Sequence, residues 1–324
     1  MLRRQKGPVL GDVLNAEKDK QQPKHRRDNR TMKYSALYPI VAGLALSAML
    51  LPATALAEKK TPFEATETDA PWNFNFFPGS DGNLHVFDGK ATFDMASDES
   101  RVAGTGWYTI YLNMNPTTGA STLWGKFHLE NEDGEWDGCY TGTDKGFTAT
   151  CVGSGDYEGL VSRWVWTPNN DGNGLYHWKG YIVENGRGDV SFKISGWRTE
   201  QELPPLTNPT QLPFYLLAPL KEGAGKASHL GVFTELQKIG LAKITSFPTP
   251  LNADFCGSSI LKAANGDLLN MVAFGQITSG QIEVTEAYLA GGTGRFEHAT
   301  GFFACPLQGT PFDYTYTATG TIRY

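Results

Sequence analysis

The chain has 324 residues, of which 19% are charged and 40% are hydrophobic, with 37 glycines and 18 prolines. This composition is too apolar for a disordered chain and too polar for a protein that crosses a membrane many times, so it predicts a globular protein of one or two domains. Glycine, threonine and aromatic residues crowd the second half of the chain, which favours short strands and turns over long helices.

Residues 32–57 have the layout of a secretory signal peptide. One basic residue, Lys33, precedes an uncharged apolar run, and the small-residue triplet 55–57 follows it. The apolar run at 38–51 has 14 residues, fewer than the roughly 20 that span a bilayer. We therefore expect cleavage after Ala57, no stable membrane anchor, and a periplasmic or extracellular location.

Residues 1–31 precede this signal and show no apolar periodicity. Two explanations remain open: a start codon assigned too far upstream of Met32, and a long basic leader in which Arg26 and Arg27 resemble a twin-arginine signal. We favour the first, because the apolar run begins well after Arg27. Residues 1–57 would then form no part of the mature protein.

The expected mature chain is acidic. Residues 1–57 hold ten Lys and Arg and four Asp and Glu, so their removal leaves 18 basic and 30 acidic residues and a net charge of −12. Such a chain repels phosphate backbones, and no nucleic-acid partner is expected.

The four cysteines predict two disulfides, because an exported chain folds in an oxidising compartment. Four cysteines allow three connectivities, and pairing within each domain is the most economical of them. We therefore predict that Cys139 pairs with Cys151 and that Cys256 pairs with Cys305.

The proline-rich stretch around residues 198–220 marks a domain boundary, because proline donates no backbone hydrogen bond and biases the preceding residue to extended backbone. We place a linker at 198–215, a tryptophan-rich β domain at 58–197, and a second β domain at 216–324. All eight tryptophans precede the linker.

A faint repeat relates the two halves. The segment VGSGDYEG at 152–159 matches GGTGRFEH at 291–298, and three downstream positions match in the same order. These positions are Tyr176, Gly180 and Ile182 in the first half and Tyr316, Gly320 and Ile322 in the second. The two matches suggest a duplication.

The local patterns predict antiparallel strands and hairpins. In residues 313–324 aromatic and aliphatic residues alternate with threonines, which is the period of a half-buried strand. Asn265 and Gly266 predict a type I′ hairpin, and Asp133 and Gly134 predict a second hairpin. Only residues 232–240 show a competing helical spacing. Regular short strands without crossover helices predict an all-β fold, a barrel or a sandwich.

The segment YLAGGTGRFEHATG at 288–301 resembles the Gly-Gly-Thr-Gly-aromatic motif of dirigent proteins and allene oxide cyclases. Together with GKASHLGVFT at 225–234, it is similar to small secreted bacterial proteins of the same barrel superfamily. The resemblance covers residues 216–324, and the N-terminal half only through the repeat. It implies two antiparallel β-barrel-like domains, the C-terminal one an eight-stranded barrel with an apolar interior. No catalytic set carries over residue by residue.

The predicted ligand site lies on the inward face of the last strand. We expect Tyr314, Tyr316 and Ile322 to line an apolar pocket, because eight strands leave room for packed side chains or one small ligand. Three functions remain open: binding of a small apolar molecule, a cyclase or isomerase that uses an inward carboxylate, and carbohydrate binding or surface interaction. Ligand identity, catalysis and oligomeric state are left open.

Other motifs have simpler explanations. Trp164, Trp166 and Trp178 either form an exposed platform for sugar rings or fill the core, and we favour the core.

Residues 169–174 resemble the start of a calcium-binding loop, but Gly180 stands where the loop needs a glutamate, so we expect a turn. Glu158 and Glu297 follow aromatic residues and are expected to face solvent. We predict no metal and no cofactor.

Overall fold

The computed structural model describes residues 59–70, 74–79, 81–168, 176–184, 189–201, 213–247, 250–310 and 313–324. Every described residue belongs to one compact unit, Ala55–Tyr324. The predicted signal peptide at 32–57 and the calcium-like segment at 169–174 lie outside the described residues.

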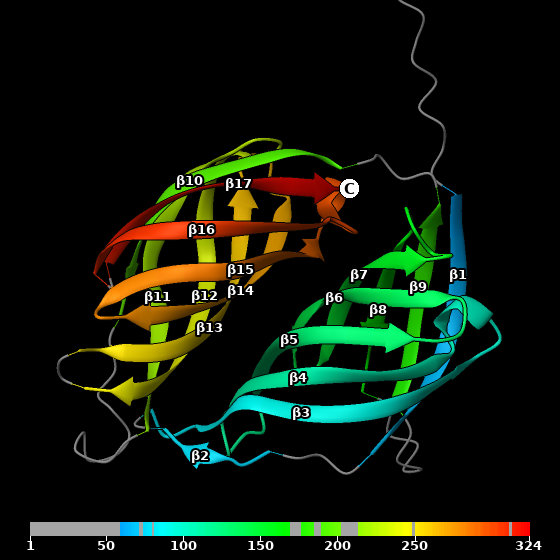
Figure 1. The fold of residues 1–324 in the computed structure, drawn as a ribbon, viewed down its shortest axis with the longest axis horizontal. Coiled ribbons are helices and arrows are strands. Elements are labelled where there is room, and N and C mark those ends of the chain that lie inside the picture. The colour runs from blue at the N-terminus through cyan, green and yellow to red at the C-terminus, as the bar shows by residue number, and fades with distance from the viewer. Residues whose placement is uncertain are drawn as a thin grey trace, which may run out of the picture. The chain divides into compact units, whose positions relative to one another are not determined.

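The described elements are strands and two short 3₁₀ helices, and they form two sheets (Figure 1). No helix among the described residues has the length and apolar character needed to span a membrane. The first sheet contains β1 (Lys59–Asp69), β2 (Phe77–Pro78), β3 (Leu84–Ser97), β4 (Gly104–Met114), β5 (Ser121–Glu130), β6 (Gly134–Thr143), β7 (Gly146–Gly155), β8 (Val161–Trp166) and β9 (Tyr176–Glu184), with η1 (Ser100–Val102) after β3.

The second sheet contains β10 (Val190–Glu200), β11 (Phe214–Ala227), β12 (Gly231–Ser246), β13 (Asn252–Ala263), β14 (Leu268–Thr278), β15 (Gln281–Gly292), β16 (Thr300–Thr310) and β17 (Asp313–Arg323), with η2 (Gly294–Phe296) after β15.

The first sheet is antiparallel throughout, and its end strands meet. Its order is β1-β9-β8-β7-β6-β5-β4-β3-β2, and an additional pairing joins β1 to β3. Residues 65–69 of β1 pair with 93–97 of β3, while 59–67 pair with 176–184 of β9. Eight of the nine strands therefore close into a ring, which we call the N-terminal barrel.

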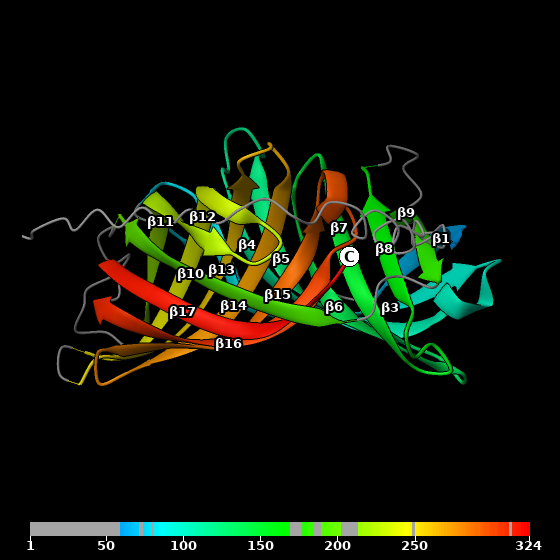
Figure 2. The same cartoon turned by 90° about the horizontal axis from the view of Figure 1, so that it is seen from above.

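The second sheet is a closed barrel in chain order from β10 to β17, and we call it the C-terminal barrel. Figure 2 shows β17, in red, between β10 and β16, in agreement with its pairing to both. The predicted all-β fold with an eight-stranded C-terminal barrel is confirmed. The barrel begins at Val190 and not at residue 216, because β10 is its closing strand and precedes the proline-rich segment. Residues 202–212 of that segment lie outside the described residues.

The hairpin predictions are confirmed, with one correction to turn type. Strands β13 and β14 pair around Asn265 and Gly266, but positive φ is found at Gly266 and not at Asn265. A type I′ turn requires positive φ at both central residues, so this turn is of another type. Residues 232–240 lie within strand β12, because pairing to β11 and β13 overrides their helical spacing.

The sequence repeat falls on equivalent places in the two barrels. In each barrel it spans the connection between the sixth and seventh strands of the ring. The backbone hydrogen bonds also correspond: Tyr157 N donates to Ser154 O, and Phe296 N donates to Thr293 O. Both aromatic side chains are buried, and the following Glu158 and Glu297 are exposed, as expected.

The barrels pack against each other through their outer faces. One buried cluster contains Tyr111 and Trp124 from the first sheet and Val272 and Phe274 from the second. The Thr141 and Ser258 hydroxyls are 2.9 Å apart in a hydrogen bond beside this cluster. An ion pair between Lys126 and Glu286 also joins the two barrels.

The predicted disulfides are wrong: Cys139, Cys151, Cys256 and Cys305 are all free and buried. Cys151 pairs in register with Gly138, so Cys139 is one residue out of step with it and points to the opposite face of the sheet. Cys151 lies in the N-terminal barrel core, and Cys139 lies in the cluster between the barrels. Cys305 and Cys256 are separated in the same way, inside and outside the C-terminal barrel.

Candidate functional site

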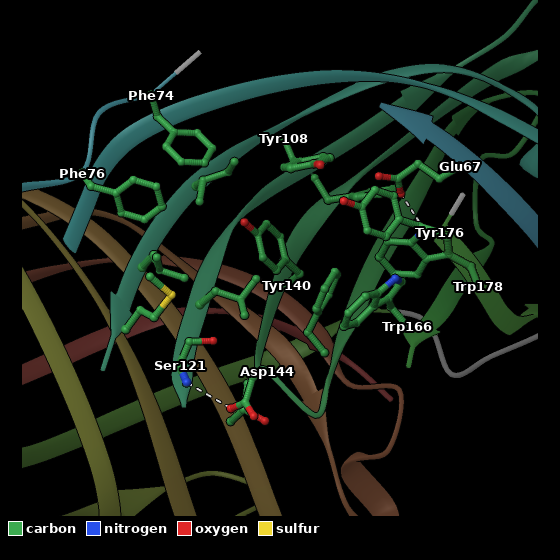
Figure 3. Close-up of a pocket in the computed structure, with 17 residues that line it drawn as sticks. Glu67, Phe74, Phe76, Tyr108, Ser121, Tyr140, Asp144, Trp166, Tyr176 and Trp178 are labelled. Atoms are coloured by element: carbon green, nitrogen blue, oxygen red, sulfur yellow. Dashed lines mark hydrogen bonds between the residues drawn. The ribbon is translucent and has the colours of Figure 1, made fainter. Parts of the chain in front are cut away.

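The N-terminal barrel contains a pocket of about 260 Å³ (Figure 3). Figure 3 shows Glu67, Trp166, Tyr176 and Trp178 gathered at one end, and Phe74 and Phe76 at the other. Most of the lining side chains are aromatic or aliphatic: Phe74, Phe76, Tyr108, Ile110, Leu112, Met114, Leu123, Phe127, Tyr140, Phe147, Trp166, Tyr176 and Trp178. Glu67, Ser121, Thr143 and Asp144 are the remaining residues.

The alternation of the strands directs these side chains inward. In β4 the residues Tyr108, Ile110 and Leu112 follow a period of two, so they share one face of the sheet. Register brings β5 alongside, where Phe127 is the direct partner of Tyr108. Closure of the sheet turns this apolar face into the wall of a cavity.

One rim of the pocket is polar. The backbone N–H of Ser121 donates to the Asp144 carboxylate at 3.0 Å, a bond drawn in Figure 3. Asp144 and Thr143 are exposed to solvent, so this rim lies at the surface of the barrel.

Glu67 is the buried polar group of the pocket, with 3% of its surface exposed. Its Oε2 atom accepts a hydrogen bond of 2.6 Å from the indole Nε1 of Trp178. Asp69 lies two residues after Glu67 on β1. Its carboxylate accepts a hydrogen bond from the Tyr108 hydroxyl, which is 3.0 Å from each carboxylate oxygen. A hydrogen bond also joins Glu67 to Asp69, so the two acidic side chains and Tyr108 form a connected group. Glu67 and Tyr108 line the pocket, whereas Asp69 is not among its lining residues.

Burial, a hydrogen bond to Asp69 and the charge of Asp69 together raise the pKa of Glu67 to about 9, although the hydrogen bond from Trp178 opposes the shift. Glu67 is consequently protonated at neutral pH. A buried carboxyl group with a shifted pKa, in a concave apolar pocket, is a common feature of binding and catalytic sites.

The tryptophans fill the interior, as we favoured. Trp164 is fully buried and Trp178 is 2% exposed, while Trp166 is half-buried against Phe147 at a ring distance of 4.8 Å. These three side chains face inward and offer no platform to a polysaccharide on the outer surface.

The predicted ligand residues lie inside the C-terminal barrel. Tyr314, Tyr316 and Ile322 are buried and belong to one core cluster. The threonines between them are exposed, so the predicted alternation is confirmed. Whether these residues bind a ligand remains a prediction.

The C-terminal interior is also more polar than we expected. Arg198 Nε lies 2.5 Å from Glu235 Oε2, and the two side chains are 5% and 0% exposed. The Tyr314 hydroxyl donates to Glu200 Oε1 at 2.6 Å, and the Arg198 guanidinium lies 4.9 Å from the centre of the Tyr316 ring. The expected apolar lining therefore surrounds a buried ion pair.

Sequence reasoning missed Glu67. The signal was present in β1, where Phe63, Ala65 and Glu67 fall on the face that is buried. A glutamate at the third position of an inward series indicates an interior carboxyl group. No group of three or more His, Cys, Asp or Glu suited to a metal ion is found in the described part of the chain.

The chain matches no protein-family model, no curated protein and no solved structure.

Proposed function

We propose that this protein binds a small, largely apolar molecule in the pocket of the N-terminal barrel. The observation that carries the proposal is the 260 Å³ cavity walled by aromatic and aliphatic side chains around the buried Glu67. Ligand sites are usually preformed concave pockets of this kind, in which a few polar groups fix the orientation of the ligand. The resemblance of the glycine-rich motif to barrels with apolar interiors extends to the N-terminal barrel only through the repeat at 152–159.

A pocket-filling variant tests the proposal. The neutral fluorescent probe N-phenyl-1-naphthylamine is titrated into the full chain, and its binding is followed by energy transfer from the tryptophans. We expect Leu123→Trp, which places a larger side chain in the pocket wall, to weaken binding at least about tenfold. Val152→Trp is the matched control, because Val152 lies on β7 of the same barrel and is 36% exposed.

The same titration compares the two barrels. If Tyr316→Ala weakens binding more than Thr317→Ala while Leu123→Trp has no effect, the ligand enters the C-terminal barrel, as the sequence suggested. A folded protein that binds no apolar probe at all contradicts both locations.

The enzymatic alternative has one specific observation in its favour, which is the carboxyl group of Glu67 beside the cavity. A protonated acid at this place is suited to proton donation to a bound molecule. The two functions are distinguished by whether a bound molecule is chemically unchanged when it is extracted from the protein after prolonged incubation. Unchanged ligand supports binding, and conversion that is lost in Glu67→Gln supports catalysis.

We propose also that the protein acts after export, in the periplasm or outside the cell. The support is the basic residue, apolar run and Ala-Leu-Ala triplet of residues 32–57. Mass spectrometry of exported protein is expected to find Glu58 as the first residue. A mature chain that retains residues upstream of Ala57 would contradict this cleavage.

A further inference from the structure

A groove of about 390 Å³ lies on the outer face of the N-terminal barrel. Trp107 forms one of its walls and is 40% exposed. In β4 this residue precedes the inward-facing Tyr108, so its side chain points away from the barrel interior. No described residue lines both this groove and the pocket around Glu67. The groove is therefore a separate feature of the barrel.

The indole of Trp107 is held in one orientation. His128 is its direct partner on β5, and the two rings stack with their centroids 5.3 Å apart and an angle of 18° between their planes. The imidazole is fixed in turn, because its Nδ1 lies 2.8 Å from Asp137 Oδ1 and its Nε2 lies 3.6 Å from Glu130 Oε2. A ligand that stacks on a side chain held in this way pays little for ordering it.

One face of the indole is covered by His128, and the other is turned to the groove. Thr92 of β3 is the direct partner of Trp107 on the side opposite to His128. Thr92 and Ala70 line the groove, whereas His128 does not. Both of these lining side chains are small, so the hollow lies beside the large ring.

A row of polar side chains runs beside the indole. Thr68, Asp94, Thr105 and Glu130 are successive partners across four strands, and all of them line the groove. The row lies two residues, or roughly 7 Å, along the strands from Trp107. Its carboxylates accept hydrogen bonds, and its threonine hydroxyls both donate and accept them.

The charge and the hydrogen-bonding groups of the groove restrict its ligand. Asp69, Asp94 and Glu130 line it, and no Lys, Arg or His is found among the described residues that do so. An anionic ligand would meet like charge without a basic partner. A simple cation would match the carboxylates but could accept nothing from the threonines. A molecule with several hydroxyl groups can donate to the former and exchange hydrogen bonds with the latter.

We propose that this groove binds a neutral saccharide, with one sugar ring stacked on Trp107 and its hydroxyl groups bonded to Asp94 and Glu130. The face of an indole is electronegative and attracts the C–H groups on the flat side of a sugar ring. Hydrogen bonds from hydroxyl groups to ionised carboxylates are stronger than those between neutral groups. The inference goes beyond the proposed function, because it concerns another ligand and the opposite face of the sheet.

A panel of neutral hexasaccharides tests the inference: cellohexaose, maltohexaose and N-acetylchitohexaose. Each is titrated into the full chain at pH 7 by calorimetry, and tetramethylammonium chloride is titrated as a cation without hydroxyl groups. We expect at least one hexasaccharide to bind saturably. Its affinity should change less than about twofold when sodium chloride is raised from about 50 to 500 mM, because salt screens only interactions between charges.

Variants locate the binding site. Trp107→Ala removes the stacking surface and should weaken binding at least about tenfold, while Trp107→Phe keeps a ring and should lose less. Asp94→Asn should weaken binding several-fold. Trp197→Ala is the matched control, since Trp197 lies on β10 of the other barrel and is 42% exposed. Its affinity should equal that of the wild type.

Several outcomes would overturn the inference. These are binding of no hexasaccharide, binding that Trp107→Ala and Asp94→Asn leave unchanged, and binding of tetramethylammonium alone, which would indicate a cation site. The proposed function is tested separately. Trp107→Ala should bind N-phenyl-1-naphthylamine like the wild type, which also shows that it folds, and Leu123→Trp should leave the saccharide affinity unchanged. If Trp107→Ala does not fold, the result with Asp94→Asn decides.

Discussion

The two barrels can be aligned through their closing strand pairs. Gly180 pairs with Phe63 in the N-terminal barrel, and Gly320 pairs with Phe192 in the C-terminal barrel. Four residues further along β1 from Phe63, Glu67 pairs with Tyr176. Four residues further along β10 from Phe192, Gly196 pairs with Tyr316. Two positions further along, Asp69 of the first barrel corresponds to Arg198 of the second.

These few differences give the two interiors different linings. A Cβ atom at Gly196 would lie 2.7 Å from the Tyr316 hydroxyl, so glycine lets this ring lie close over the strand. Arg198, with its partner Glu235, is buried in the same interior. In the N-terminal barrel Glu67 occupies the place of the glycine, and the pocket lies beside it. The strand framework is thus shared, and the side chains at equivalent positions decide what lines each interior.

The largest effect is expected for the ion pair of the C-terminal barrel. Arg198→Met leaves Glu235 buried without its cation, which should lower the free energy of unfolding by about 3–5 kcal/mol. The double variant Arg198→Met, Glu235→Leu should recover at least half of this loss, because it removes the orphaned charge. Urea unfolding measures both. A single variant within about 1 kcal/mol of wild type would show that the pair contributes little to this barrel.

Matched truncations compare the packing of the two interiors. Leu261 is fully buried in the C-terminal core, so Leu261→Ala should cost about 2–5 kcal/mol. Leu123 is half-buried on the pocket wall, and Leu123→Ala should cost about 1 kcal/mol, because the cavity is already present. Equal costs in urea unfolding would contradict the contrast between a packed core position and a position on the pocket wall.

Glu67 gives the N-terminal barrel a pH dependence that can be isolated. Its folded-state pKa, about 9, lies above the ordinary value of 4.5, so the folded protein holds a proton that the unfolded chain releases between these values. Stability from this group is therefore full below pH 4.5 and is lost as pH rises toward 9.

The variant Glu67→Gln, which imitates the protonated acid, should flatten this dependence. We expect its melting temperature to exceed that of the wild type at pH 8.5 and to be close to it at pH 4.5. Glu132→Gln, at an exposed hairpin position, serves as the control. A variant that is less stable than the wild type at pH 8.5 would contradict a protonated Glu67.

The smallest effect is expected from reducing agent. Loss of a native disulfide typically costs 2–5 kcal/mol, but all four cysteines are free here. Addition of dithiothreitol should therefore change the free energy of unfolding by less than about 0.5 kcal/mol. Denatured but unreduced protein should take up four alkyl groups by mass spectrometry, and uptake of none or two would show that disulfides form.

Some features of the fold were determined by the sequence alone. The alternation from Tyr314 to Ile322 predicted both a strand and its inward face, because the direction of a side chain in a strand depends only on its parity. The repeat at 152–159 and 291–298 predicted corresponding places in two similar domains, since a tight turn constrains its own residues. Local constraints of this kind are visible in a short window of sequence.

Other features were decided by tertiary structure. Pairing of β10 with β17 placed Arg198 inside a barrel, although its own neighbours in sequence suggested a linker. Strand register set Cys139 and Cys151 on opposite faces, although their spacing suggested a bond. The pocket around Glu67 exists because β1 pairs with both β3 and β9 and so closes the ring. Strand β9 lies more than a hundred residues after β1 along the chain. Pairings between distant segments depend on the packing of the whole chain, so no local pattern could show where this pocket would form.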